Sequence, residues 1–105
     1  MAEESDARFV IGRMGGIEDV DDGACALLGY TRAEILELHG ADLVLPEERP
    51  AVAVSLDQMR HDTLRWRQGR LLRKDRGVVR VEVRSRPLPE GRLELNIRAL
   101  ADGPR

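Results

Sequence analysis

Three runs in the C-terminal half of the chain alternate between apolar and polar residues with a period of two. They read "TLRWRQGRLLRK", "VVRVEVRS" and "RLELNIRA", and this alternation predicts β-strands with one buried face. Gly69 interrupts the alternation of the first run and predicts a β-bulge there. Turn-forming residues at 75–77 and 89–91 separate the runs, so this half is expected to form a three-stranded antiparallel meander.

The N-terminal half predicts shorter elements. The run "RFVIGRM" favours a strand, and the two glycines at 15–16 lead into "IEDV", which together predict a hairpin. The segment after Asp21 carries apolar residues at helical spacing and ends at Gly29, which is typical of a short capped helix. Thr31 and Glu34 form a capping box that begins a second short helix.

A longer helix is predicted between these segments and the meander. In "AVAVSLDQMRHD", Val52, Leu56 and Met59 recur at i, i+4 and i+7 and form one apolar stripe. The preceding "LPEERP" has the prolines and acidic residues that favour the first turn of a helix. Two strands, several short helices and three further strands indicate an α+β fold.

Composition limits the class of protein. With 105 residues, 42% of them hydrophobic and 34% charged, the chain fits one domain, residues 1–105, with a core from about 8 to 100 and tails at 1–7 and 101–105. No apolar run is long enough to span a membrane, and the start "MAEESD" is unlike a secretory signal, so a cytoplasmic location is expected. The single Cys25 is expected to be a small apolar residue of the first helix, and His39 has no acid or histidine at ligand spacing, so no metal site is predicted.

Charge is unevenly distributed along the chain. Residues 1–59 contain 13 acidic residues and 4 arginines, whereas residues 60–105 contain 13 basic and 6 acidic residues. The arginine-rich strands are consistent with binding of a nucleic acid or with a solvated sheet face, and the lack of an aromatic ladder for base stacking favours the solvated face. On that face Arg80, Arg84 and Arg98 are a candidate surface for an acidic partner.

Several segments together resemble PAS domains over nearly the whole chain. The segment "IEDVDDGACALLGYTRAEIL" is similar to the family's Ile-x-x-Val-Asn, Ala-rich helix and Leu-Leu-Gly-Tyr-Ser/Thr-x-x-Glu-Leu pattern. The segments "LPEER", "RKDRG" and "PLPEGRLELNI" are similar to its Pro-Glu-Asp helix start, its Lys-Asp-Gly hairpin and its final hairpin. The chain departs from the pattern at Asp21, usually Asn, at Arg76, inserted before Gly77, and at 99–101, where the family often has the Asp-Ile-Thr that connects to an output helix.

The resemblance implies a five-stranded antiparallel sheet of order 2-1-5-4-3, with short helices and one longer helix packed on one face. It also implies a sensory or regulatory module of a bacterial-type signalling protein, acting by dimerisation, by docking of an effector domain or protein, or through a small ligand in an apolar pocket between the sheet and the long helix. By strand alternation and the helix stripe, the expected pocket lining is Leu28, Val52, Leu56, Met59, Trp66, Val81, Val83, Leu95 and Ile97.

The cofactor alternatives need different residues. Haem-binding members of the family hold iron through a histidine near the end of the long helix, and His61 resembles that position. Flavin is not favoured, because the family's Asn-Cys-Arg-Phe-Leu-Gln motif is absent and the chain has few aromatic residues. A small apolar ligand, or none, fits better. No nucleophile-base pair or phosphate-binding glycine loop is present in the sequence, so no enzymatic activity is expected.

Overall fold

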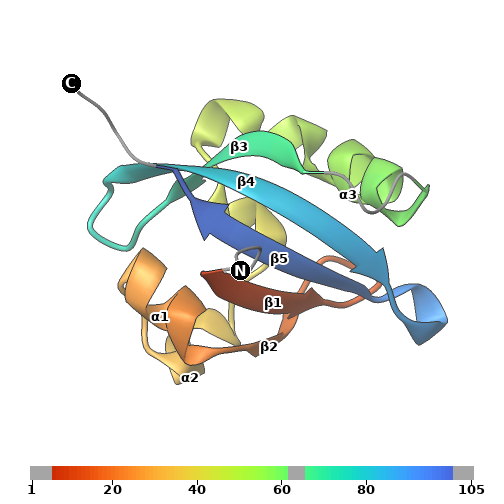
Figure 1. Ribbon diagram of the computed structural model, residues 1–105, viewed down its shortest axis with the longest axis horizontal. Coiled ribbons are helices and arrows are strands. Elements are labelled where there is room, and N and C mark those ends of the chain that lie inside the picture. The colour runs from red at the N-terminus through yellow and green to blue at the C-terminus, as the bar shows by residue number, and fades with distance from the viewer. Residues whose placement is uncertain (1–5, 62–65, 101–105) are drawn as a thin grey trace.

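A five-stranded antiparallel sheet forms the centre of the structure, a computed structural model that describes residues 6–61 and 66–100. Its order, β2-β1-β5-β4-β3, is the one that the resemblance implied (Figure 1). Because β1 pairs with β5, the N-terminal hairpin and the C-terminal meander share one sheet. The strands are β1 (Ala7–Ile11), β2 (Ile17–Val20), β3 (Arg67–Leu72), β4 (Val78–Pro87) and β5 (Leu93–Ala99).

The ladder between β3 and β4 is regular. Gly69 lies opposite Val81, and the pairing continues without a shift along the whole of β3, so the predicted bulge at Gly69 is wrong. A register irregularity occurs instead between Val10 and Ile11, where β1 pairs with β2. Gly69 therefore lies in a regular strand. Because it has no side chain, it leaves empty space on the inner face of the sheet.

Local capping explains where the first helices begin and end. The Oδ1 atom of Asp21 accepts a hydrogen bond from the backbone N–H of Ala24 at 2.9 Å, and Gly29 ends the helix with φ 81°. The capping box of Thr31 and Glu34 is present as predicted. The helices are α1 (Asp22–Leu28), α2 (Arg32–Ile35), α3 (Val52–His61) and the 3-10 helices η1 (Gly40–Leu43), η2 (Pro46–Ala51) and η3 (Pro89–Gly91).

The segment "LPEERP" forms a 3-10 helix and not the first turn of the long α-helix. It forms most of η2, which runs directly into α3 without a break in the chain. In the described part of the chain, no helix is long and apolar enough to cross a membrane.

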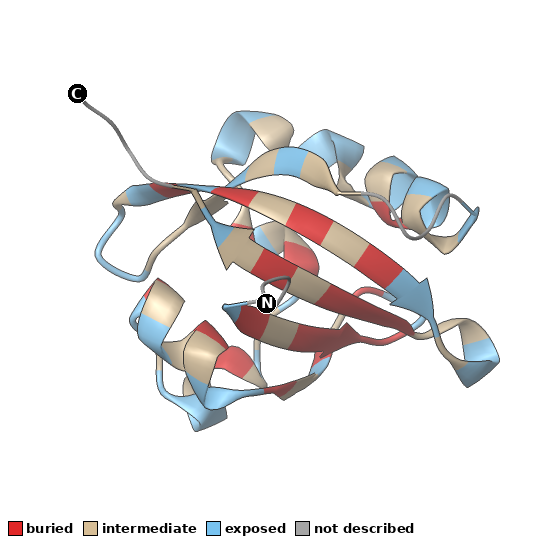
Figure 2. Ribbon diagram, in the orientation of Figure 1, coloured by how far each residue is buried: buried red, intermediate tan, exposed pale blue. Residues whose placement is uncertain are grey.

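The core lies between the inner face of the sheet and the helices (Figures 1 and 2). Odd-numbered residues of β1, β4 and β5 face inward, and Val81 and Ile97 are almost fully buried among them. Leu28 of α1 and Ile35 of α2 complete this part of the core. Leu56 is the one buried residue of α3. The long helix is therefore held to the sheet by few deeply packed side chains.

A buried carboxylate joins three strands on the outer face. Glu94 of β5 is only 7% exposed, and its oxygens accept hydrogen bonds from Arg8 Nε of β1 at 2.6 Å and from Arg86 Nε of β4 at 3.0 Å. The hydrogen bond from Arg86, followed by the bond and charge of Arg8, lowers the pKa of Glu94 to about 2 against the opposing effect of burial. This group thus favours the folded state when it is ionised.

We predict that the Glu94 cluster makes the free energy of unfolding decrease at acidic pH. Because the pKa of Glu94 is lower in the folded state, its contribution is fully present above the unfolded pKa of about 4 and is lost as the pH falls to about 2. Glu94→Gln should lower the free energy of unfolding at pH 7 by roughly 2 kcal/mol, the range for hydrogen bonds to charged groups. Urea unfolding of both proteins across this pH range measures the difference, which should shrink toward pH 2. A difference that is independent of pH would contradict the assignment.

Candidate functional site

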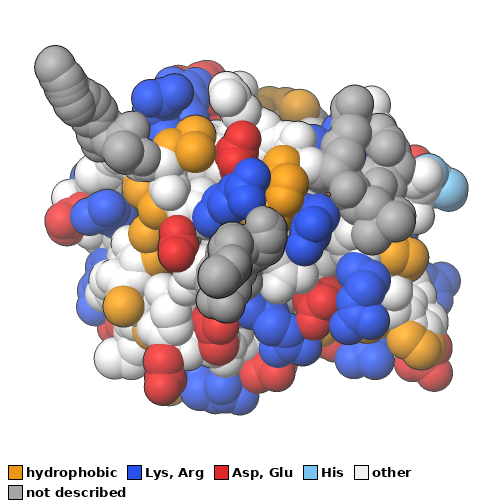
Figure 3. Space-filling view, in the orientation of Figure 1, with side chains coloured by type: hydrophobic (Ala, Val, Ile, Leu, Met, Phe, Trp, Pro, Cys, Tyr) orange, Lys and Arg blue, Asp and Glu red, His pale blue; other side chains and the backbone are white. Residues whose placement is uncertain are grey.

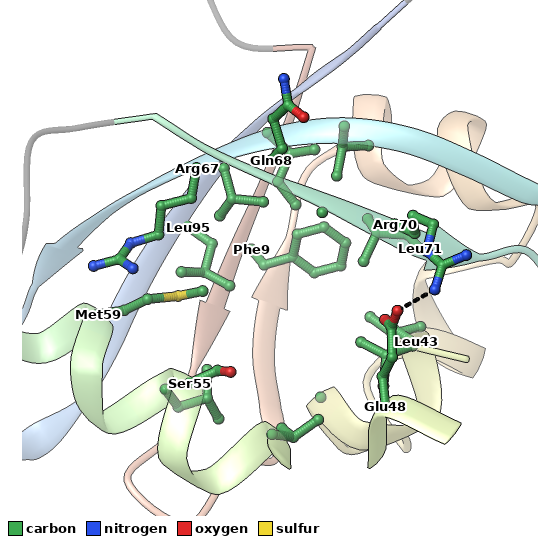
Figure 4. A pocket seen from close by; sticks show the side chains of 18 of the residues that line it. Phe9, Leu43, Glu48, Ser55, Met59, Arg67, Gln68, Arg70, Leu71 and Leu95 are labelled. Atoms are coloured by element: carbon green, nitrogen blue, oxygen red, sulfur yellow. Dashed lines mark hydrogen bonds and ion pairs between the residues drawn. The ribbon is translucent and has the colours of Figure 1, made fainter. Parts of the chain in front are cut away.

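A cavity of about 660 Å³ lies between the inner face of the sheet and the η2–α3 segment (Figure 4). Its walls come from β1, β3, β4, β5, η1, η2 and α3, so every layer of the fold contributes to it. The lining residues are Phe9, Ile11, Gly40, Leu43, Val44, Glu48, Ala51, Val52, Ser55, Leu56, Gln58, Met59, Arg67, Gln68, Gly69, Arg70, Leu71, Arg80, Val81, Val83, Leu95, Ile97 and Leu100.

Small residues on both sides explain why this space is not filled. On β3 the residues opposite the buried valines of β4 point inward, and the middle one is Gly69. A Cβ added to Gly69 would meet its nearest neighbour, Val81 Cγ2, only at 4.0 Å, so the position is open rather than crowded. From the opposite wall, α3 directs Ser55 into the cavity (Figure 4). A glycine on one wall and a serine on the other leave room that two larger side chains would occupy.

The cavity opens between β3 and the η2–α3 segment. An ion pair between Arg70 of β3 and Glu48 of η2 bridges this opening at one end (Figure 4). The Glu48 carboxylate raises the pKa of the Arg70 guanidinium, first through their hydrogen bond and then through its charge. Both side chains are partly exposed, so the pair is screened by salt and is a weak closure.

The chemistry of the cavity is that of a binding site with an apolar interior. Phe9, Leu43, Leu95 and Met59 line its inner part, whereas charged and amide groups lie at the rim on β3 and η2 (Figure 4). Among the described residues, no group of three or more histidine, cysteine, aspartate or glutamate side chains is placed to hold a metal ion. Such a site can enclose a small molecule and fix one polar end of it at the rim.

Seven of the nine residues expected to line the pocket do so. The sheet supplies Val81, Val83, Leu95 and Ile97, and the helix supplies Val52, Leu56 and Met59. Strand alternation and the helix stripe thus correspond to the side of the sheet and of α3 that faces the cavity.

Leu28 and Trp66 are the two that lie elsewhere. Leu28 is completely buried in the core between α1 and the sheet, away from this cavity. Trp66 directly precedes Arg67, which faces inward opposite Val83, so Trp66 falls on the outward phase of the strand. The predicted position of Trp66 at the mouth of the pocket is wrong for this reason.

Sequence reasoning missed the contributions of β1 and η1. Phe9 and Ile11 of β1 reach the cavity because they lie on the inner face of the strand, which the consecutive apolar residues of "RFVIGRM" do not reveal. Leu43 and Gly40 reach it because η1 packs beneath β3, which local periodicity does not reveal.

The two histidines have other roles. His61 is exposed at the end of α3, where its Nδ1 lies 2.9 Å from the carbonyl oxygen of Asp57, and it does not line the cavity. The structure therefore gives no support to His61 as an iron ligand inside this cavity. His39 begins η1, with its Nδ1 accepting from the N–H of Ala41 at 3.0 Å.

Trp66 instead belongs to a basic cluster on the outer face of the sheet. The guanidinium carbons of Arg98 and Arg84 lie 3.8 and 4.7 Å from the centroid of its ring. Arg98 also donates to Glu82 at 2.8 Å. Basic and acidic side chains lie side by side on the face of the molecule where the sheet is in front of α3 (Figures 1 and 3). The basic cluster thus consists of Trp66 and two arginines with Glu82 beside them, and Arg80 lies on the same outer face of β4.

Comparisons with known proteins give a consistent result. The family model described as "PAS fold" matches residues 17–96. A domain of a sensory box sensor histidine kinase/response regulator from Geobacter sulfurreducens is 26% identical with a TM-score of 0.78, covering 89% of this chain and 82% of that chain. The PAS domain of an HTR-like protein from Haloarcula marismortui is 28% identical with a TM-score of 0.77, covering 90% and 86%.

A more distant structure was solved with a small molecule. The PAS domain of a LuxR-family transcriptional regulator from Burkholderia thailandensis, in complex with ethanol, is 16% identical with a TM-score of 0.72, covering 90% of both chains. The search of curated proteins gave no match.

The different positions of Leu28 and Met59 predict different costs of truncation. Leu28→Ala should lower the free energy of unfolding by about 3 kcal/mol, because it leaves a void in a closed core. Met59→Ala should cost roughly 1 kcal/mol, because a half-buried side chain is shortened beside space that is already open. Urea unfolding measures both values. Equal losses would contradict the separation of core and cavity.

Proposed function

Because the chain belongs to the PAS family, a family of signal-sensing and regulatory modules, we propose that it senses a small, largely apolar molecule bound in the cavity behind β3. The observation that carries this proposal is a volume of about 660 Å³ with a mainly apolar lining and few polar groups, most of them on β3 and η2. Ligand sites of proteins fall in a range of roughly 300–1,000 Å³ and have this distribution of polarity. A binding role without catalysis is part of the proposal.

The lining favours a compact, flexible ligand over a flat cofactor. Phe9 is the aromatic residue that the described part of the lining offers, which gives little stacking surface for a flavin or haem. Ser55 on α3 and Arg67 on β3 provide polar contacts near the opening. A short aliphatic alcohol or acid matches both features, and the distant Burkholderia domain was solved with an alcohol.

Coupling to a conformational change follows from how α3 is held. Leu56 is its buried anchor, and Ser85 Oγ donates to the carbonyl of Met59 at 2.9 Å as a polar link to β4. A ligand that touches both α3 and the sheet adds contacts between two weakly joined elements, and so favours the conformation in which they lie together. The position of α3 against β4 is thus the element that ligand binding would bias.

We predict that Ser55→Leu abolishes ligand binding by filling the cavity from α3. Leucine keeps the helix, and at this position its side chain would occupy part of the cavity volume. Straight-chain alcohols and short fatty acids serve as probes, and amide chemical-shift changes measured by NMR should weaken at least tenfold. The matched control is Val54→Leu on the exposed side of α3, where Val54 is 60% exposed, and it should bind as the wild type does. Equal binding by both variants would show that the cavity is not the site.

A second candidate function is docking through the outer face. It is favoured by the basic cluster around Trp66, because aromatic and arginine side chains are enriched among residues that dominate protein interfaces. Either a second copy of the chain or an effector with acidic groups could meet Arg80, Arg84 and Arg98 there.

Reversal of charge on this face tests the second candidate. Arg80→Glu together with Arg84→Glu should reduce self-association or effector binding at least tenfold, because two attractive groups become repulsive. Analytical ultracentrifugation of the purified protein over a range of concentrations measures the self-association. Arg76→Glu, an exposed reversal in the β3–β4 turn, is the control and should have no effect. Association that survives the double reversal would exclude this face as the interface.

A further inference from the structure

The free edge of β3 has a defined set of unpaired backbone groups. The N–H of Arg73 donates to the carbonyl of Gly77 at 2.8 Å, which fixes the phase of the β3–β4 ladder. In an antiparallel pair, hydrogen-bonded and non-hydrogen-bonded residues alternate. Leu71, Gly69 and Arg67 therefore bond to β4, and the backbone N–H and C=O groups of the residues between them point to the opposite edge.

Those edge residues are Gln68, Arg70 and Leu72. Within residues 6–61 and 66–100, no hydrogen bond connects their backbone groups to any segment across the edge. An unpaired strand edge is a template for another extended chain. The other edge of the sheet, β2, has 4 residues, whereas β3 has 6 and offers the longer template.

The free edge of β3 is also the rim of the cavity. Five consecutive residues of β3, 67–71, line the cavity, and its opening lies between this strand and α3. In a strand added at this edge, the residue opposite Gly69 points to the same face as Gly69, which is the cavity side. Since Gly69 has no side chain, one apolar side chain of the added strand can enter there.

Charge indicates the chemistry of the added strand. The neighbours of Gly69 on the outward phase are Gln68 and Arg70, and Arg70 lies opposite Arg80 on β4. Side chains of an added strand that face outward would pass beside these two arginines. Acidic residues there could share Arg70 with Glu48, whose ion pair is partly exposed. A second β3 strand has two arginines and no acidic residue, so it offers no charge complementary to Arg70.

We propose that the β3 edge receives an extended peptide segment of a partner protein, with acidic residues alternating around one apolar residue. The backbone pairs with Gln68, Arg70 and Leu72, the apolar side chain enters the cavity at Gly69, and the acidic side chains lie against Arg70 and Arg80. This inference deepens the proposed function, because a small ligand and the peptide side chain would compete for the same volume. A ligand that fills this volume would thus release the partner.

The experiment uses a fluorescein-labelled peptide of alternating glutamate and valine, with a lysine-valine peptide as the charge control. Fluorescence anisotropy should show binding of the acidic peptide that weakens with salt, and binding of the lysine peptide at least tenfold weaker. Gln68→Pro removes an edge N–H that the ladder to β4 does not use, and should weaken binding at least tenfold. Gln68→Ala keeps that N–H and is the matched control, with binding like the wild type.

Hydrogen exchange on the wild-type protein gives an answer that needs no variant to fold. The bound acidic peptide should slow exchange of the amides of Gln68, Arg70 and Leu72, whereas those of Gly69 and Leu71 are already bonded to β4 and should change little. Absence of peptide binding, or binding without this pattern, would overturn the proposal. A dimer that forms without peptide and is lost in Gln68→Pro would also overturn it, by assigning the edge to a second copy.

Failure of the peptide proposal can be distinguished from failure of the proposed ligand binding. If alcohols or fatty acids bind and Ser55→Leu abolishes their binding, the cavity is a ligand site whether or not the peptide binds. If the peptide binds but those probes do not displace it, the peptide pairs with the backbone of β3, and the proposal that its apolar side chain shares the cavity with the ligand is wrong.

Discussion

The phase of the β4 and β5 strands is the constraint on which the rest of the molecule depends. Odd-numbered residues of both strands face the helices, and even-numbered residues face away. A shift by one residue would turn the even-numbered residues Arg80, Glu82 and Arg84 into the core in place of the valines, so the register is specified by the cost of burying those charges. The Glu94 cluster adds to this specification, because it pairs with arginines on both neighbouring strands only in this register.

Short helices on a wide sheet explain why a cavity remains. α1 and α2 pack closely over β1 and β2, where Leu28 and Ile35 are fully buried. The region in front of β3 and β4 is left to η2 and the single long helix, which contributes one deeply buried residue. Gly69 on the sheet side and Ser55 on the helix side then keep the space open. The interior is therefore close-packed at one end and hollow at the other.

The helices and strands were predicted better from the sequence than the arrangement of their side chains around the cavity. Alternation, caps and turn residues located the strands and the first helices. The helix stripe named Val52, Leu56 and Met59, of which Leu56 is buried and the other two are half-buried. These signals are local, and each has a physical cause within a few residues. The bulge expected at Gly69 was wrong because a glycine in a strand has two common causes, a bulge and a vacant side-chain position, and sequence pattern alone does not separate them.

The outward position of Trp66 has a different physical origin. A large aromatic residue near a pocket-lining strand suggests a pocket wall, but the phase set by Arg67 opposite Val83 turns Trp66 outward. An arginine thus occupies the inward position at the end of β3, where its long stem can cover apolar surface while its head stays near the rim. The buried valines of β4 fix which residues of β3 face inward. This register decides the side on which a residue lies more strongly than its own hydrophobicity does. The cavity and the outer edge of the sheet meet at β3, because the strand with the vacant side-chain position at Gly69 is also the strand whose far side has no partner among the described residues.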